Sequence, residues 1–314
     1  MNNKLTVMSY NIEHMKRMVY KGKIRDEDRT EAVAQTIEHV APHLLGIVEA
    51  TPKREDHELF IQNKFINQLK FKIGKSDHDR GQQDMVFYYR DPVELVELDP
   101  AVEFYDSWLE DIDDDGIKEL CEFERIPLEG LFKVSDVEFM VILVMTKSKG
   151  VFSVNDLIMH QHLALANRKR QLAQAKKIRQ RVDVLMDEYP ERPIIVMGDF
   201  NDDPGMDSYE RLLGSSSIET IMGSVYSPGR ILHNALWHLK EKGTPVWTTE
   251  YPDLIVHNLK NHRGWLDHIF LSPNLLDEQA ALHYVSESGE VFPKSKVTVR
   301  ASDHLPIYCE LRFN

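Results

Sequence analysis

The most informative stretch of this chain is an apolar run that ends in polar residues, Pro193-Ile194-Ile195-Val196-Met197-Gly198-Asp199-Phe200-Asn201. A short run of large apolar residues is typical of a strand buried in a sheet. Asp199 and Asn201 follow the run, at the end of a strand where a scaffold holds functional side chains. The stretch therefore predicts a buried strand that delivers a carboxylate and an amide to a site.

Similar apolar runs recur along the chain and alternate with helical patterns. Apolar residues with helical spacing occupy residues 29–40 and 167–188. No linker-like tract or internal repeat divides the chain. We therefore expect one α/β domain over residues 1–314, with the irregular acidic segment at about 91–135 as an insert. The expected strands are residues 5–10, 44–48, 85–89, 139–145, 194–197, 269–272 and 307–311.

The composition excludes several classes of protein. With 314 residues, 42% hydrophobic and 28% charged, the chain is neither disordered nor fibrous. No apolar run approaches the roughly 20 residues that span a bilayer, and the N-terminus has no signal-peptide core, so we expect a cytoplasmic protein without membrane contact. Cys121 and Cys309 lie far apart in sequence and form no cluster, so neither a disulfide framework nor a structural zinc site is indicated. No feature indicates an oligomeric state.

The net charge of −13 comes from one segment. Residues 91–124 hold 14 acidic side chains and one Lys, so the rest of the chain keeps 37 of the 38 basic and 37 of the 51 acidic residues and is neutral. Residues 168–182 hold seven basic side chains and no acidic one. A phosphate-bearing ligand is therefore expected to approach this face, with Arg170 and Lys147 as candidate phosphate contacts. The alternative is a solvated helix face.

The acidic segment contains the spelling of a calcium loop, Asp111-Ile112-Asp113-Asp114-Asp115-Gly116, followed by Glu122. Its oxygens and glycine match D-x-[DN]-x-[DN]-G-x5-E, so Asp111, Asp113, Asp115 and Glu122 are candidate Ca²⁺ ligands. Against this, the usually apolar eighth position is Lys118, and residues 123–128 have an extended pattern instead of an exit helix. A solvated acidic loop is the alternative.

Other polar residues mark the ends and starts of the expected strands. They occur in Ser9-Tyr10-Asn11, Val48-Glu49, Asp267-His268 and Ser302-Asp303-His304. Taken singly, each has an ordinary structural explanation, such as a cap, a turn or a core histidine. Together they form an oxygen-rich set of Glu, Asp and Asn, which Mg²⁺ or Mn²⁺ prefers. This combination suits phosphate chemistry, in which a metal neutralises charge on the phosphoryl oxygens.

In this order, the motifs resemble the endonuclease/exonuclease/phosphatase superfamily, the deoxyribonuclease I and exonuclease III type. The resemblance spans nearly the whole chain and is most specific at Gly198-Asp199-Phe200-Asn201 and Ser302-Asp303-His304. Residues 42–49, which end in Glu49, are similar to a strand of that family. The resemblance implies a four-layer α/β/β/α sandwich of two packed mixed sheets in a single domain, with an active site and a magnesium ion at one end.

The resemblance also implies a set of metal ligands. Glu49 would be the principal ligand of Mg²⁺, with Asn11 and Asp303 assisting it. Manganese is the other cation that such a set would accept. Asn11 is a catalytic candidate as well.

The catalytic roles follow from the same resemblance. Asp199 would orient or activate the attacking water, and Asn201 would hold this water and a phosphate oxygen. His304 would contact the scissile phosphate, while Asp267 fixes its tautomer and supports its charged form.

One position departs from the family pattern. Met145 stands where the family usually has a His, or in some apurinic endonucleases a Tyr. A thioether neither donates a proton nor carries charge. Three interpretations remain open: the catalytic step is slower, a nearby group such as Lys147 substitutes, or the protein only binds its ligand.

These observations predict a divalent-metal-dependent phosphoester hydrolase of the phosphodiesterase or nuclease type, acting by in-line attack of water. Its substrate would be a nucleic acid or a small phosphorylated molecule. A duplex-DNA enzyme is expected to carry more net basic surface, so a phosphatase of a small phosphorylated metabolite is one alternative. The other is a non-catalytic binding protein that retains the fold.

Overall fold

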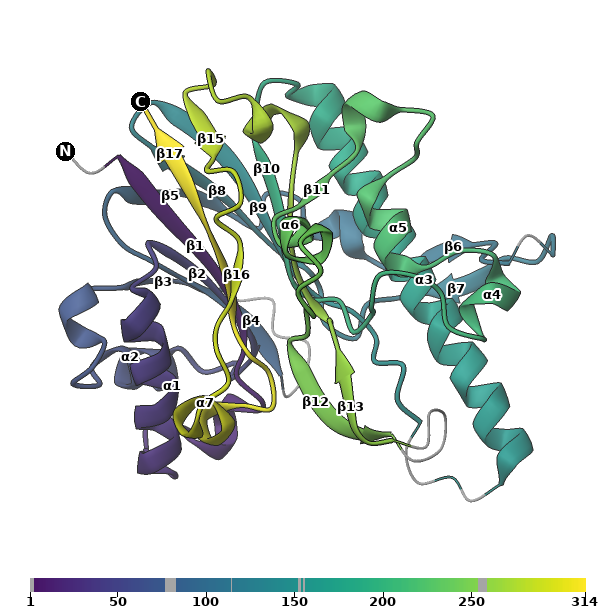
Figure 1. Ribbon diagram of the computed structural model, residues 1–314, viewed down its shortest axis with the longest axis horizontal. Coiled ribbons are helices and arrows are strands. Elements are labelled where there is room, and N and C mark those ends of the chain that lie inside the picture. The colour runs from purple at the N-terminus through teal and green to yellow at the C-terminus, as the bar shows by residue number, and fades with distance from the viewer. Residues whose placement is uncertain (1–2, 77–82, 114, 152–153, 155, 254–258) are drawn as a thin grey trace.

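The computed structural model describes residues 3–76, 83–113, 115–151, 154, 156–253 and 259–314. Two large β-sheets face each other at its centre, and helices cover their outer faces (Figure 1). Both sheets mix parallel and antiparallel pairs. This confirms the four-layer α/β/β/α sandwich expected from the sequence. Within the described residues, no helix is long and apolar enough to cross a bilayer.

The first sheet has seven strands in the order β15-β17-β1-β2-β4-β3, with β16 also paired to β17. Its strands are β1 (Lys4–Asn11), β2 (Leu44–Ala50), β3 (Lys72–Gly74), β4 (Asp84–Tyr89), β15 (Leu282–Tyr284), β16 (Glu290–Val291) and β17 (Ile307–Phe313). β1 runs parallel to β2 and antiparallel to β17. Because β1 and β2 are parallel, Asn11 and Glu49 emerge at the same edge of the sheet.

The second sheet has six strands in the order β11-β14-β10-β9-β8-β5. They are β5 (Val93–Leu98), β8 (Leu128–Val134), β9 (Val137–Met145), β10 (Ile194–Asp199), β11 (His233–Asn234) and β14 (Asp267–Leu271). In this register Asp199 lies beside Met145 of β9 and Asp267 of β14. β5 and β8, which begin and end the acidic segment, also belong to this six-stranded sheet.

Helices cover the outer faces of the two sheets (Figure 1). On the first sheet lie α1 (Glu27–Val40), α2 (Arg54–Ile61) and α7 (Lys296–Ala301), and on the second lie α3 (Leu157–Glu188) and α5 (Ser217–Met222). The carboxylates of Asp26 and Asp156 cap α1 and α3 by accepting backbone N–H groups. The remaining helices are α4 (Glu210–Leu213), α6 (Trp237–Glu241), η1 (Met15–Arg17), η2 (Asn67–Leu69), η3 (Val102–Tyr105), η4 (Pro228–Arg230) and η5 (Pro273–Leu276).

Two hairpins lie outside the sandwich. One consists of β6 (Trp108–Glu110) and β7 (Glu119–Cys121), and it belongs to the acidic segment. The other consists of β12 (Thr249–Asp253) and β13 (Leu259–Gly264), and it extends from the end of the sandwich that holds the strand ends described below (Figure 1).

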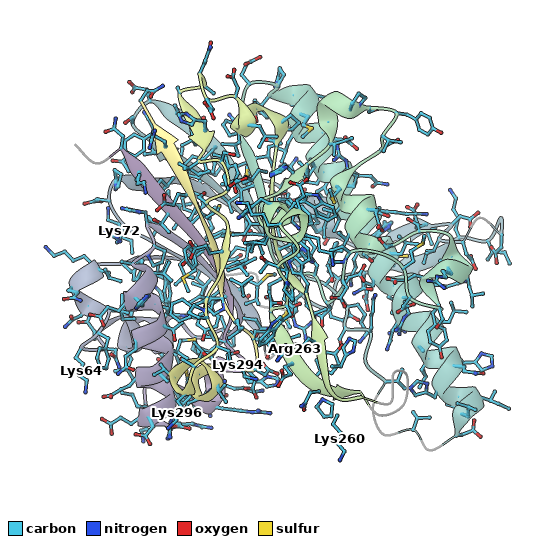
Figure 2. The ribbon with its side chains drawn as sticks, in the orientation of Figure 1. Lys64, Lys72, Lys260, Arg263, Lys294 and Lys296 are labelled. Carbon is cyan, nitrogen blue, oxygen red and sulfur yellow. The ribbon has the colours of Figure 1, made fainter. Side chains whose placement is uncertain are left out.

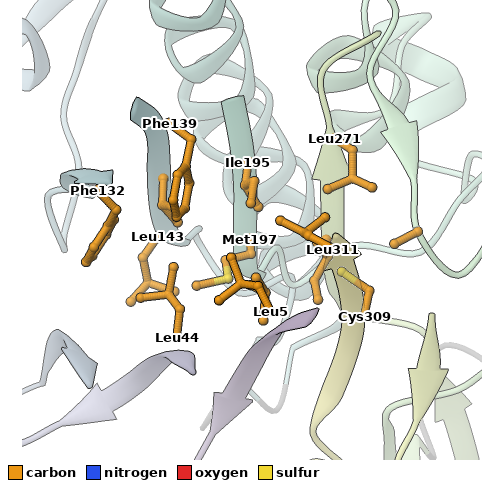
Figure 3. Packing of buried hydrophobic residues seen from close by; sticks show 14 of the residues in the cluster. Leu5, Leu44, Phe132, Phe139, Leu143, Ile195, Met197, Leu271, Cys309 and Leu311 are labelled. Atoms are coloured by element: carbon orange, nitrogen blue, oxygen red, sulfur yellow. The ribbon is translucent and has the colours of Figure 1, made fainter. Parts of the chain in front are cut away.

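The main hydrophobic core lies between the two sheets. Alternate residues of β17 point inward, so Cys309 and Leu311 pack with Leu5 of β1 against Met197 and Leu271 of the opposite sheet (Figure 3). Burying each large apolar side chain contributes about 1.5–3 kcal/mol. Both cysteines are buried and free, which agrees with the expected absence of a disulfide.

Some cations of the basic helix α3 pair with carboxylates of the acidic segment. Lys169 Nζ lies 2.6 Å from Asp113 Oδ2 and 3.0 Å from Glu119 Oε1. Arg181 forms two hydrogen bonds, of 2.8 and 2.9 Å, with the buried carboxylate of Glu129 on β8. Lys169 and Arg181 of α3 are therefore bound to carboxylates of the acidic segment within the chain.

Candidate active site

Side chains from both sheets meet at one end of the sandwich. The amide of Asn11, at the end of β1, donates to Glu49 Oε1 at 3.3 Å and to Asp199 Oδ2 at 3.0 Å. Glu49 belongs to the first sheet and Asp199 to the second. Asn11 therefore holds two carboxylates from opposite sheets close together, as expected for a site built from strand ends.

The end of β10 requires glycine before the carboxylate. Gly198 has φ +140°, and a Cβ at this position would lie 2.0 Å from the carbonyl oxygen of Val144. Asn201 has φ +49°, and its backbone N–H donates to Asp199 Oδ1 at 2.8 Å. Its side-chain amide donates to the carbonyl of Thr146 at 3.1 Å. These bonds fix the direction of the Asp199 carboxylate.

The expected pair of Asp267 and His304 is formed. His304 Nδ1 lies 2.7 Å from Asp267 Oδ2, and both side chains are buried. Ser302 Oγ accepts the backbone N–H of His304 at 3.1 Å and donates to the carbonyl of Asn11 at 2.7 Å. The Ser302 hydroxyl thus locks the His304 segment onto the end of β1.

Burial and charge shift both central titratable groups. Burial and the nearby carboxylate of Asp267 raise the pKa of Asp199 to about 7, although His304 and two hydrogen bonds oppose this shift. Burial by itself would lower the pKa of His304, but Asp267, Asp199 and Asp303 raise it to about 10. Nitrogen and carboxylate oxygens of Asp199, Asp267 and His304 lie within 4.8 Å of one another. A carboxylate with a raised pKa beside a charged imidazole is suited to proton transfer.

Glu49 is held by residues that the sequence did not reveal. Its backbone has φ +58°, a strained conformation for a residue other than glycine. Its Oε2 atom accepts the backbone N–H of His14 at 2.9 Å and the amide of Gln83 at 2.7 Å. Arg125 Nε in turn donates to Gln83 Oε1 at 3.1 Å. No local pattern signalled His14, Gln83 or Arg125, because these contacts depend on tertiary packing.

The oxygen-bearing side chains at this end of the sandwich are of the type that a hard divalent cation prefers. Glu49 keeps 14% of its side chain exposed, and Asp303 is exposed next to His304. The Asn11 amide draws the carboxylates of Glu49 and Asp199 together, which concentrates negative charge at the edge of the site. Asn11 Oδ1 itself accepts the N–H of Glu13 at 2.9 Å. An all-oxygen set rich in carboxylates is what magnesium and manganese prefer.

Met145 packs in the core between the sheets. It lies beside Asp199 in the register of β9 and β10 and is 7% exposed. The next two residues hold neighbouring loops, because Thr146 Oγ1 donates to the carbonyl of Phe200 at 2.5 Å and the N–H of Lys147 donates to Gln174 Oε1 at 2.7 Å. The Met145 position thus provides an apolar contact beside Asp199.

The two candidate phosphate contacts, Arg170 and Lys147, lie on different elements. Arg170 is exposed on α3, outside the six-stranded sheet. Lys147 follows β9, and its carbonyl accepts the amide of Gln171 at 3.0 Å. Gln171 also donates to the carbonyls of Phe200 and Asn201, at 3.1 and 2.8 Å. Gln171 therefore joins the end of β9 to the turn after β10, a contact that sequence reasoning overlooked because Gln171 lies among the basic residues of α3.

The candidate calcium ligands lie in the turn of the β6–β7 hairpin. Carboxylate oxygens of Asp111, Asp113 and Asp115 lie within 4.8 Å of one another, while Glu122 is exposed just after β7. The Asp111 carboxylate accepts the backbone N–H groups of Asp115 and Gly116. Lys169 pairs with Asp113, so a cation from α3 already contacts this turn. Calcium binding stays a prediction.

Comparison with known proteins decides the family. The sequence profile of the Endonuclease/Exonuclease/phosphatase family matches residues 8–304, which include every strand-end residue of the candidate site. The chain belongs to this family. Members of the endonuclease/exonuclease/phosphatase family are typically hydrolytic nucleases and phosphodiesterases that depend on a divalent metal. No curated protein sequence matches the chain.

Several solved structures share this fold. Truncated TDP2 from Caenorhabditis elegans is 14% identical with a TM-score of 0.56, over 99% of this chain and 98% of that one. D. rerio TDP2, complexed with a single-strand DNA product, is 15% identical with a TM-score of 0.55, over 99% and 100%. The human Nocturnin catalytic domain, with a bound sulfate anion, is 17% identical with a TM-score of 0.55, over 100% and 96%.

Proposed function

We propose that this protein hydrolyses a phosphodiester by in-line attack of water, with a divalent cation as cofactor. The observation that carries the proposal is the meeting of Asn11, Glu49, Asp199, Asp267 and His304 at one end of the sandwich. The substrate would be a nucleic acid or a small phosphorylated molecule, since the family acts on both kinds of phosphoester.

Asp199 is the group that would orient and activate the water. Its Oδ1 is held by the N–H of Asn201 and its Oδ2 by the amide of Asn11. With its pKa raised to about 7, the ionised carboxylate is a stronger base than an ordinary aspartate and accepts a proton from water more readily. Asn201 lies two residues further on and would hold the same water or a phosphate oxygen.

His304 is the group that would meet the phosphate. Because Nδ1 is bound to Asp267, Nε2 is the nitrogen left to donate to a phosphate oxygen. The pKa of about 10 keeps the ring charged at neutral pH, and this charge stabilises negative charge that develops in the transition state. Asp267 fixes the ring in this orientation.

Glu49 and Asp303 would hold the cation, with Asn11 orienting the Glu49 carboxylate. When bound, a magnesium or manganese ion supplies Lewis-acid stabilisation of the phosphoryl oxygens. The experiment is hydrolysis of bis-p-nitrophenyl phosphate after chelation and after return of Mg²⁺ or Mn²⁺, for wild type and Glu49→Gln. We expect activity that returns with the metal, and a higher metal requirement in the variant. Equal activity with and without metal would contradict the cofactor assignment.

Met145 favours a second candidate function. Without a polar ring beside Asp199, the site has one fewer group to stabilise the leaving oxygen, which is consistent with a protein that binds phosphoesters without cleaving them. The same assay separates the two candidates, since a binding protein would show no metal-dependent turnover. Including p-nitrophenyl phosphate, a monoester, distinguishes a phosphatase from a phosphodiesterase.

A further inference from the structure

Four cations gather on one face beside the candidate active site. Lys260 and Arg263 lie on β13, Lys294 lies just before α7, and Lys296 is its first residue. Figure 2 shows all four around the β12–β13 hairpin and α7, whereas Lys64 and Lys72 lie near α2 and β3. All four are exposed, on a chain whose net charge is −13. These four exposed cations therefore stand out against the overall negative charge of the protein.

A single carboxylate holds two of these cations in place. Glu250 lies opposite Arg263 in the β12–β13 register. Its two oxygens lie 2.9 Å from Arg263 Nε and 2.9 Å from Lys294 Nζ. Glu250 thus balances one of the four positive charges in this group. Arg263 and Lys294 keep 56% and 40% of their side chains exposed, so they remain accessible to a phosphate.

Aromatic rings lie among the cations. The Trp247 ring centroid lies 4.6 Å from the Arg263 guanidinium carbon and 5.5 Å from Lys294 Nζ. On the neighbouring part of β12, Tyr251 is 37% exposed, and its ring centroid lies 5.2 Å from that of His262. Proteins that bind single-stranded nucleic acid combine cations for the phosphates with aromatic rings on which bases stack.

The hairpin is attached directly to the catalytic segments. Thr249 forms a β-bridge with His304, and its hydroxyl donates to the carbonyl of Asp303 at 3.0 Å. The hydroxyl of Thr248 accepts the N–H of Asp267 at 3.1 Å. Glu250, which holds Arg263 and Lys294, follows these two threonines. The group of cations therefore begins one residue from the bridge to His304. A strand with one phosphate at His304 would continue across this face.

We propose that this face binds single-stranded nucleic acid next to the phosphodiester that reacts. The proposal rests on the proposed function and names the substrate class of the same site. A single strand fits better than a duplex, because only unpaired bases can stack on protein rings. We call this surface the cationic face, and it consists of Trp247, Tyr251, Lys260, Arg263, Lys294 and Lys296.

The test is a direct binding measurement that does not need catalysis. Fluorescence anisotropy of a labelled oligothymidylate of about 12 nucleotides is followed in EDTA, at about 50 and 200 mM salt. The variants are Lys260→Gln/Lys296→Gln, which removes two exposed charges, and Trp247→Leu, which removes a ring. The matched control is Lys64→Gln/Lys72→Gln, because it removes the same charge from another face. Thermal unfolding confirms that each variant is folded.

We expect roughly five- to tenfold weaker binding for Lys260→Gln/Lys296→Gln, and a salt slope lower by about 1.4 if both contact phosphates. Trp247→Leu should also weaken binding, and the control pair should change it less than about twofold. Equal affinities for the two double variants, tighter binding of a duplex of equal length, or no binding by wild type would each overturn the proposal.

Hydrolysis of bis-p-nitrophenyl phosphate by wild type separates this inference from the proposed function. If wild type hydrolyses this substrate but the variants of the cationic face bind the oligonucleotide as tightly as wild type, only the cationic face is rejected. If the variants of the cationic face bind more weakly and wild type does not hydrolyse the substrate, the cationic face is supported and the catalytic proposal is rejected.

Discussion

Asp267 and His304 form a buried pair that joins the two sheets, with 2.7 Å between Oδ2 and Nδ1. Asp267 begins β14 of the six-stranded sheet, and His304 leads into β17 of the seven-stranded sheet. The pair therefore depends on correct packing of the sandwich. It also fixes the ring nitrogen that faces the site and keeps the ring charged.

Asp267→Asn is expected to lower kcat by roughly 100-fold or more, because His304 would lose the carboxylate that orients and charges it. KM should change little, since Asp267 is not placed to touch substrate. Steady-state kinetics with bis-p-nitrophenyl phosphate measure both constants. An unchanged kcat in a variant with wild-type thermal stability would contradict the role of the pair.

Substitutions of Met145 test whether this residue serves packing or limits catalysis. Because Met145 lies in the core between the sheets, Met145→Leu should cost less than about 1.5 kcal/mol of unfolding free energy and leave turnover unchanged. Met145→His should lose stability, because it places a polar ring among apolar side chains. Urea unfolding and turnover are measured on both variants. Faster turnover of Met145→His would instead show that the missing ring limits catalysis.

The segment that follows Asp199 is anchored by a half-buried cation. Lys149 contacts Asp202, and its Nζ lies 2.8 Å from Glu210 Oε1 and 3.6 Å from Asp207 Oδ2. Lys149→Met leaves these carboxylates without their cation, so we expect a loss of about 3–5 kcal/mol in unfolding free energy.

Exposed ion pairs provide the comparison for Lys149. Arg54 and Glu58 form a pair on α2 with about 60% of each side chain exposed. Arg54→Met should therefore change the urea unfolding free energy by less than about 1 kcal/mol. Similar losses in Arg54→Met and Lys149→Met would contradict the anchoring role.

Two buried histidines predict how stability depends on pH. Burial lowers the pKa of His57 and of His268 to about 4, below the value near 6.5 of an unfolded chain. Between pH 4 and pH 6.5 the unfolded state binds more protons than the folded state. The contribution of each histidine to the free energy of unfolding is therefore fully present above pH 6.5 and is lost as the pH drops toward 4. We expect a loss on the order of 2 kcal/mol per histidine between pH 8 and pH 5.

Urea unfolding of wild type and His57→Gln at pH 8, 6.5 and 5 measures this dependence. His57 is bound to the hydroxyl of Tyr88 and the carbonyl of Thr51 and not to Asp199, Asp267 or His304, so its variant separates stability from the chemistry of the site. The variant should lose less stability than wild type over this range. The same pH dependence in both proteins would contradict the assignment.

Much of the fold followed from local patterns. Every apolar run expected to be a strand is one, from β1 to β17, because each is short, apolar and bounded by turn residues. The helix expected at 167–188 begins earlier, at Leu157. Its first turns expose Leu157 and Ile158, so they have no buried stripe to signal a helix.

The site was predictable where residues occupy strand ends and not where loops converge. Asn11 and Asp199, and the pair of Asp267 and His304, meet as the motifs indicated. Gln83 and Gln171 were missed, because each acts through contacts with residues more than 20 positions away. The basic helix α3 was only partly understood, since Lys169 and Arg181 turn out to pair with the acidic segment.

The most direct test compares wild type with Asp199→Asn, purified identically, in the hydrolysis of bis-p-nitrophenyl phosphate with Mg²⁺ or Mn²⁺. The carboxylate that accepts the proton is replaced by an amide of the same shape, so folding should be preserved. We predict metal-dependent turnover by wild type and a loss of roughly 100- to 10,000-fold in the variant. Equal rates for the two proteins would contradict the proposal that Asp199 and its neighbours form a hydrolytic site.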